Sequence, residues 1–345
     1  MMVDPLVVGD ECAFSAKDVS AELQKIEGPF SKSNSLDALG KLKEWLVNEQ
    51  SDSSIIVSEN FHWYGGVARI FDFMETNMDD WDCVAAAAAI ISDLLSLRWN
   101  ESEQKRKIAI EVAKMIVRRN GIKILLLAVN CDRIMKHNGV LSDTIHVWIA
   151  IGRIMNGEET REMIEKQQKF CILKAAIDFI YHLQRLGSDH NDKNVCFSDV
   201  LLAVLYAIAN NIKDPSIQKG HLINRDLVGL CIKIMKTNDD WNYNHEVVTY
   251  LLGIITICTK EKKIVSKNRF EELLPLLVRS MRVFGENLEI RCFVLVLLEC
   301  TCEKVSREKF ESTGALEAVF ALLELEGLGT NTKEKVQNVI REMLT

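Results

Sequence analysis

The stretch GGVARIFDFMETNMDDWDCVAAAAAIISDLLS, residues Gly65 to Ser96, decides the fold. It contains two runs of apolar residues spaced three and four apart, separated by a polar turn. The first run is Val67, Ile70, Phe71 and Met74, and the second is Val84, Ala87, Ala88, Ile91, Leu94 and Leu95. Such spacing places apolar side chains on one face of a helix. The stretch therefore predicts two helices joined by a turn.

Part of this helix pair occurs a second time in the chain. FMETNMDDW, residues Phe73 to Trp81, is echoed by IMKTNDDW, residues Ile234 to Trp241. The two tryptophans are 160 residues apart. A supersecondary unit that recurs is the mark of a repeat protein, in which each unit buries its apolar face against its neighbours.

A recurring anchor marks the first helix of each expected unit, at intervals of 44 to 56 residues. The anchors are Gly66, Gly121, Phe170, Asp226, Phe270 and Gly314. The second helices are expected at residues 84–97, 142–155, 198–212, 246–259, 288–303 and 332–344, with extra loops at 131–138 and 188–194. Gly65, Gly66 and Gly121 are expected in turns, where a positive φ is often needed.

These units resemble armadillo repeats. EKFESTGALEAVFALLEL, residues Glu308 to Leu325, has the short helix, the Gly turn and the G-x-L-x-x-x-x-x-L-L pattern of that family, and Pro275 in NRFEELLPLLV suits the start of a helix. The resemblance implies an all-α, right-handed α-solenoid of about six repeats over residues 33–345. HEAT repeats are the near neighbour. Residues 1–32 are expected to form a partly flexible leader, with a short amphipathic piece at Val19, Leu23 and Ile26.

Composition restricts the class of protein. Apolar residues make up 48% of the chain, enough for a continuous core, and the net charge of −7 argues against a general nucleic-acid binder. Most of the ten cysteines lie within apolar helical patterns, which indicates reduced thiols in a cytoplasmic or nuclear setting. The N-terminus has no basic region typical of a signal peptide, and no run is long enough to span a membrane. The sequence therefore predicts a soluble protein of the cytoplasm, with the nucleus as the other possibility.

Motifs for catalysis, cofactors and metals are missing from the sequence. It has no G-x-S-x-G, no phosphate-binding loop and no dinucleotide fingerprint. Cys300-x-Cys302 lacks a second pair of zinc ligands, and the acidic pairs Asp79-Asp80 and Asp239-Asp240 supply too few oxygens for Ca²⁺. We expect no cofactor and no enzymatic activity. Each acidic pair precedes a tryptophan, which indicates a helix cap with a packed Trp rather than a partner anchor.

The resemblance also predicts where a partner protein would bind. In armadillo arrays the last, or third, helix of each repeat lines the concave groove, and importin-type members carry a Trp there with an Asn one turn later. Here the Trp positions hold Ala89, Ile149, Tyr206, Leu252 and Leu295, so the ladder is absent and a nuclear-import adaptor is excluded. A solvated line of polar residues is the competing interpretation. The groove candidates for binding a protein or peptide segment are Asp93, Arg153, Tyr206, Asn210, Thr256 and Glu299.

Two other functions stay open at this point. A basic helical face could bind nucleic acid or an anionic lipid, although a solvated outer face is the usual explanation of such a run. Its members are Lys105, Arg106, Lys107, Lys114, Arg118 and Arg119. An enzyme on a helical-repeat frame would need a buried carboxylate in a pocket, whereas Asp93 and Glu299 come from units far apart in the array.

Overall fold

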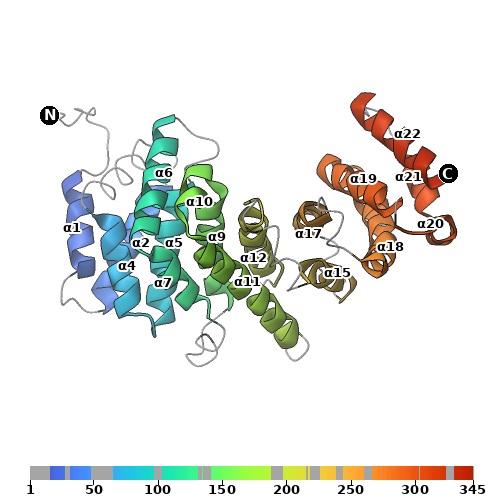
Figure 1. The fold of residues 1–345 in the computed structure, drawn as a ribbon. Helices are drawn as coiled ribbons and strands as arrows, with labels where there is room; N and C mark the ends of the chain where they lie inside the picture. Colours follow the sequence, from blue (N-terminus) through green and yellow to red (C-terminus); the bar gives the residue numbers. More distant parts are fainter. Residues whose placement is uncertain are drawn as a thin grey trace. The chain divides into compact units, whose positions relative to one another are not determined.

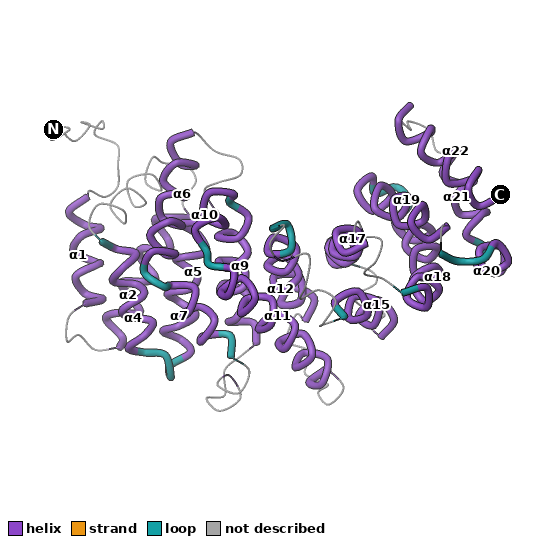
Figure 2. Tube along the Cα trace, viewed as in Figure 1, coloured by secondary structure: helices purple, strands orange, loops and turns teal. Residues whose placement is uncertain are grey.

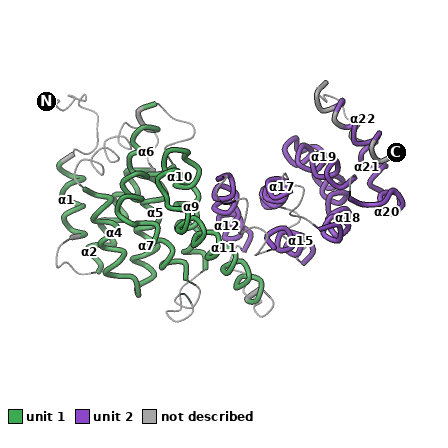
Figure 3. The backbone as a smooth tube through the Cα atoms, in the orientation of Figure 1, with its two compact units in different colours: residues 1–196 green, residues 197–345 purple. Residues whose placement is uncertain are grey.

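The computed structural model describes residues 16–27, 32–47, 65–96, 103–130, 134, 141–187, 197–214, 217, 226–237, 244–259, 266–302, 304–323 and 330–344. Within these ranges the chain forms α-helices and one 3-10 helix, Leu141–Asp143, and contains no strand (Figure 2). The chain divides into two compact units, residues 1–196 and 197–345 (Figure 3). The prediction of an all-α chain is confirmed.

Unit 1 contains two rows of packed helices. One row runs in contact order through α2, α5 and α9, and the other through α1, α4, α7 and α11 (Figure 1). The helices of unit 1 are α1 (Ala16–Glu27), α2 (Lys32–Val47), α4 (Gly66–Thr76), α5 (Trp81–Ser96), α6 (Glu103–Arg118), α7 (Gly121–Ala128), α9 (Thr144–Asn156), α10 (Glu158–Met163) and α11 (Lys166–Gly187).

Unit 2 repeats the same two-row packing. Its first row is α12, α17, α19 and α22, and its second is α15, α18 and α21. We call α2, α5, α9, α12, α17, α19 and α22 the third helices. The helices of unit 2 are α12 (Phe197–Asn211), α15 (Leu227–Thr237), α17 (His245–Thr259), α18 (Lys267–Phe284), α19 (Leu288–Cys302), α20 (Arg307–Thr313), α21 (Ala315–Leu323) and α22 (Thr330–Leu344).

The six second helices expected from the sequence are present. They are α5, α9, α12, α17, α19 and α22, and each begins and ends within three residues of its predicted bounds. Their apolar residues are buried on more than one side, as in α12, where Leu201, Leu205 and Ala207 are completely inaccessible. A helix buried on several sides needs neighbours on each of them, which the stacking of repeats supplies.

The N-terminal segment differs from the expected leader. Residues 16–27 form α1, whose Val19 and Leu23 are completely buried, and α1 packs on α2 and α4. The amphipathic pattern is thus the buried face of a helix within unit 1. Residues 1–15 and 188–194, and most of 131–138, lie outside the described residues.

Three turn residues show how the helix pairs are joined. Gly65 and Gly314 have φ of 69°, and both adjoin the start of a helix. At the α6–α7 turn, however, Asn120 takes the positive φ of 57° instead of Gly121. Gly121 is required there by close packing, since a Cβ would lie 2.7 Å from Ile116 Cγ2 and 2.8 Å from Phe71 Cζ.

The position of Pro275 also differs from the expected start of a helix. It lies inside α18, eight residues after the first residue of that helix, rather than at a helix start. A proline at this place cannot donate a backbone hydrogen bond. The helix nevertheless continues to Phe284, with Leu273, Leu274 and Leu277 completely buried. Core packing of this face therefore outweighs the lost hydrogen bond.

Candidate functional site

The candidate residues of unit 1 bring α5 and α9 together. Arg153 of α9 donates from one guanidinium nitrogen to the backbone oxygen of Ser92 on α5, and to the Ser92 hydroxyl oxygen at 3.1 Å. Asp93 is the next residue of α5 and is half-buried, and its Oδ2 is buried without a hydrogen-bond partner. Arg153 thus connects two third helices through hydrogen bonds, and it also borders the candidate site.

Charges around Asp93 form a mixed cluster. Burial raises the pKa of the Asp93 carboxyl, whereas the charges of Lys43 on α2 and of Arg153 oppose this shift. Burial also lowers the pKa of His146 on α9, and the same two cations lower it further. His146 Nδ1 is buried without a hydrogen-bond partner. We call Lys43, Asp93, His146 and Arg153 the unit 1 charged cluster, and it combines both signs of charge.

The third helices of unit 2 carry aromatic side chains, whereas those of unit 1 carry the charged cluster. Tyr206 of α12 and Tyr250 of α17 pack edge to face, with ring centroids 6.0 Å apart and an interplanar angle of 79°. Phe293 of α19 lies over Gly253, one turn after Tyr250, because a Cβ on that glycine would be 3.3 Å from the Phe293 ring. All three aromatic residues are half-buried. We call Tyr206, Tyr250 and Phe293 the aromatic row.

Two of the predicted groove residues are buried. Asn210 is 2% exposed, and its amide donates to the Tyr206 backbone oxygen at 3.0 Å while its Oδ1 accepts from Lys213 Nζ at 2.8 Å. Thr256 is 6% exposed and donates its hydroxyl to the Leu252 backbone oxygen at 2.8 Å. Both side chains stabilise their own helices. Glu299, by contrast, is exposed on α19.

On α17 and α19, the positions aligned with the Trp of the ladder lie in the core. Leu252 and Leu295 are 0% and 2% exposed, respectively, so they belong to the core. Tyr250 and Phe293 take the accessible places instead. A signal was available in the sequence, because each aromatic residue follows a first-turn glutamate by four residues, Glu246 and Glu289, respectively.

Carboxylates accompany the aromatic row. Asp199, Glu246 and Glu289 lie in the first turns of α12, α17 and α19, and all three are exposed. Burial raises the pKa of the Tyr250 hydroxyl to about 12, and the neighbouring Tyr206, Glu246 and Glu289 add to the shift. The two glutamates are therefore close enough to act on the tyrosine hydroxyl.

The basic face is partly neutralised by its own ion pairs. Lys107 pairs with Glu103 at 2.9 Å, and Lys114 pairs with Glu111 at 2.9 Å and with Glu159 of α10 at 2.6 Å. Lys114 thus ties α6 to α10. Arg106, Lys107, Arg118 and Arg119 are exposed on this face, and the side chain of Lys105 lies outside the described residues.

The acidic pair before α5 caps that helix. Asp80 Oδ1 accepts from the Cys83 backbone N–H at 3.4 Å, and Lys32 pairs with Asp80 at 2.6 Å and with Asp82 at 3.1 Å. Trp81 is 8% exposed, which removes it as a partner anchor. The capping interpretation is confirmed here, while its counterpart at Asp239 to Trp241 lies outside the described residues.

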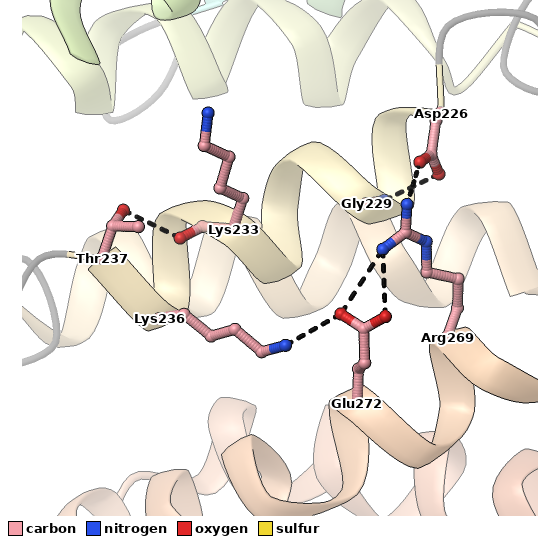
Figure 4. A network of polar contacts seen from close by, with 7 residues as sticks. All are labelled: Asp226, Gly229, Lys233, Lys236, Thr237, Arg269 and Glu272. Atoms are coloured by element: carbon pink, nitrogen blue, oxygen red, sulfur yellow. Dashed lines mark hydrogen bonds and ion pairs between the residues drawn. The ribbon is translucent and has the colours of Figure 1, made fainter. Parts of the chain in front are cut away.

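Ion pairs also connect α15 with α18 (Figure 4). Asp226 has a φ of 45°, and its Oδ1 accepts from the Gly229 backbone N–H at 3.0 Å while its other oxygen pairs with Arg269. Glu272 binds Arg269 at 3.2 Å and Lys236 at 2.8 Å, and these contacts, Lys236 first, lower the pKa of the Glu272 carboxyl. The network is a structural clamp between two helices of the second row.

The described residues contain neither a candidate metal site nor a candidate membrane-spanning helix. They contain no group of three His, Cys, Asp or Glu side chains placed to hold a metal ion. None of the described helices is both long and apolar enough to cross a membrane. A pocket between α15, α17 and α18 has no carboxylate, histidine or cysteine in its wall, which consists of Met235, Val248, Leu276, Arg279, Ser280, Val283 and Phe284.

Comparison with known proteins identifies the fold alone. No family model and no curated protein matches this sequence. The crystal structure of Uso1-2 is similar over 99% of this chain and 52% of that chain, with a TM-score of 0.58 and 14% identity. The chain thus spans about half the length of that structure. The designed armadillo repeat protein YIII(Dq)4CqI is 16% identical over 94% of this chain and 99% of that chain, but the TM-score of 0.32 carries no argument.

The two-row packing of helices and the likeness to the Uso1-2 structure agree. Both describe repeated helices that stack on their neighbours, which is the organisation of a helical-repeat array. The chain has an all-α helical-repeat fold.

Proposed function

We propose that this protein is a non-enzymatic scaffold that binds a segment of a partner protein along its third helices. The aromatic row carries the proposal. Tyr206, Tyr250 and Phe293 come from three consecutive third helices, and each residue is half-buried rather than fully enclosed in the core. Aromatic side chains contribute most of the binding energy in many protein interfaces, because they bury a large area with few rotatable bonds.

The packing of unit 2 explains why these rings are accessible. α17 packs on α15, and α19 packs on α18, while Ile254 of α17 and Leu297 of α19 are completely buried. The aromatic row lies on a different face of the same helices. A repeat array presents one such strip from each third helix, and these strips align because the helices stack in order.

The test compares partner capture by matched variants. Replacing Tyr206 and Tyr250 together with alanine is expected to reduce capture of the main partners at least tenfold, measured by affinity purification with quantitative mass spectrometry. Tyr181→Ala is the control, since Tyr181 is 39% exposed on α11, outside the third helices. Equal capture by the double variant and the wild type, with both folded by circular dichroism, would contradict the proposal.

We place the action of this scaffold inside the cell, in the cytoplasm or the nucleus. Cys83, Cys231 and Cys258 are free thiols that are buried in the helical core. Disulfides are rare in these reducing compartments, so free core thiols fit them.

Nucleic-acid or anionic-lipid binding through Arg106, Arg118 and Arg119 is less well supported, because Lys107 and Lys114 on the same face are held in ion pairs.

A further inference from the structure

The accessible face of the third helices α12, α17 and α19 is apolar. Tyr206 and Tyr250 are in contact, with ring centroids 6.0 Å apart, and Phe293 lies over Gly253 of α17. A further half-buried apolar residue continues the same face of each helix, because it lies three, four or seven positions from the aromatic residue of that helix. We call these six residues the apolar strip: Leu202, Tyr206, Tyr250, Ile257, Phe293 and Val296.

Polar side chains of these helices are turned to their own backbone. Asn210, Thr256 and Thr301 each donate to the backbone oxygen four residues earlier, at 3.0, 2.8 and 2.6 Å, respectively. Each of the three residues is at most 6% exposed. The side chains of the apolar strip itself contain two polar atoms, the hydroxyl oxygens of Tyr206 and Tyr250. The strip therefore offers a partner apolar contact and few hydrogen bonds.

This shortage of hydrogen bonds favours one backbone conformation in the partner. An extended segment has backbone N–H and C=O groups that need hydrogen bonds from the surface covering them, and leaving such groups buried and unpaired is costly. An α-helix pairs these groups within itself and presents only side chains. An amphipathic helix can thus cover an apolar surface without losing backbone hydrogen bonds.

Two carboxylates border the apolar strip. Glu246 lies four residues before Tyr250, and Glu289 lies four residues before Phe293, so each carboxylate adjoins the strip on its own helix. Both glutamates are exposed. Burial raises the pKa of the Tyr250 hydroxyl, and the charges of both glutamates add to that rise. A lysine or arginine of the partner would be attracted to this border, and an acidic residue would be repelled.

We infer that unit 2 binds an amphipathic α-helix of a partner protein, with its apolar face on the strip and Lys or Arg beside Glu246 and Glu289. The inference rests on the proposed function, because it names the kind of segment that the same third helices bind. α12, α17 and α19 contact one another in that order. Packed helices have axes about 8–10 Å apart, so three of them span about 16–20 Å, the length of about 11–14 helical residues.

Selection from a phage library of random peptides, about 16 residues long, tests the conformation against the full chain. We expect the selected peptides to carry apolar residues every three or four positions, with Lys or Arg beside that face. Proline in the middle of the best peptide should weaken binding at least tenfold by fluorescence anisotropy, because proline breaks a helix, whereas alanine at the same position should not. Apolar residues at every second position, or equal binding of the proline and alanine peptides, overturns the inference.

A pair of serine substitutions connects the selected peptide to the apolar strip. Ile257→Ser with Val296→Ser should reduce its affinity at least tenfold. The control combines Leu127→Ser with Val283→Ser, which makes the same change at residues of α7 and α18 that are 40% and 46% exposed. Circular dichroism checks that both variants are folded. Equal affinity of the two variants overturns the inference.

Charge reversal tests the border of the strip without a change in the core. Glu246→Lys with Glu289→Lys should also reduce affinity for the selected peptide at least tenfold. The control combines Glu308→Lys with Glu317→Lys, which makes the same change of net charge at exposed residues of α20 and α21. An equal loss in both pairs overturns the inference.

The natural partner separates this inference from the proposed function. If capture requires Tyr206 and Tyr250 but the bound segment tolerates a central proline, the inference is overturned and the proposed function stands. If no captured partner requires the two tyrosines, both fail. Self-association of the wild type that Ile257→Ser with Val296→Ser abolishes assigns the strip to a second copy of the chain and overturns the inference.

Discussion

Replacing Trp148 with alanine is expected to lower the free energy of unfolding by about 3–5 kcal/mol, the usual cost of removing a large aromatic side chain from a core. Trp148 of α9 is completely buried, and its ring meets the Phe179 ring edge to face at 5.5 Å. The substitution leaves a cavity between elements of unit 1 that cannot collapse fully. Urea unfolding followed by circular dichroism measures the loss as a shift of the midpoint.

Trp148→Phe is the matched control for this cavity. The indole N–H of Trp148 is buried without a hydrogen-bond partner, so phenylalanine removes a polar group that gains nothing in the folded state. Phenylalanine also keeps part of the ring packing against Phe179. We therefore expect a cost below about 1.5 kcal/mol, as for a tolerated hydrophobic exchange. An alanine variant that loses less than its phenylalanine counterpart would show that this position is not a core site.

Gly121→Ala is expected to destabilise the protein by about 1–3 kcal/mol through overpacking. The added methyl group would approach Ile116 Cγ2 to 2.7 Å, Phe71 Cζ to 2.8 Å and the Ile116 backbone oxygen to 3.0 Å. Two side chains and one backbone segment would have to move together. Thermal and urea unfolding of the variant measure the effect.

Gly40→Ala, a substitution at a second helical glycine, is expected to stabilise the protein. Gly40 lies within α2, is exposed, and has no atom within 4 Å of the place where a Cβ would be. Alanine has a higher helix propensity and restricts the unfolded chain, so we expect a gain of about 0.5–1 kcal/mol. A loss at Gly40, or a gain at Gly121, would contradict the packing described for these helices.

The helices were predictable because the information that specifies them is local. In the third helices, apolar residues recur every three or four positions, and polar turn residues separate the runs. The bounds of α17 and α19 therefore agree with prediction to one residue at each end. The burial of α1 was less visible, since a short amphipathic helix near a chain end has the same pattern whether or not it packs.

The candidate site was predicted only in part, because it depends on how neighbouring helices are rotated against one another. Aligning the third helices by apolar pattern placed Thr256 and Leu252 on the surface, whereas both are buried and Tyr250 is accessible instead. A third helix buried on several sides gives few clues to its accessible face. Tyr206 was found because the alignment placed it at a Trp position of the ladder.

Contacts of charged residues between helices could not be predicted from the sequence either. Arg153 was predicted as a groove residue, but its guanidinium is bonded to the backbone and hydroxyl oxygens of Ser92, 61 positions away. Lys114 was assigned to an exposed basic face, yet it pairs with Glu159 of α10. A single sequence does not reveal such long-range pairs, since periodicity describes each helix alone.

Photo-crosslinking tests the central claim, that a partner protein binds along the third helices, most directly. A photoreactive phenylalanine analogue would replace Tyr206, Tyr250 or Phe293 in turn, and Tyr181 or Phe320 as exposed controls on α11 and α21. We predict covalent adducts with the same partner protein from all three positions of the aromatic row and none from the controls. Adducts from the control positions alone, or equally from all five, would contradict the account.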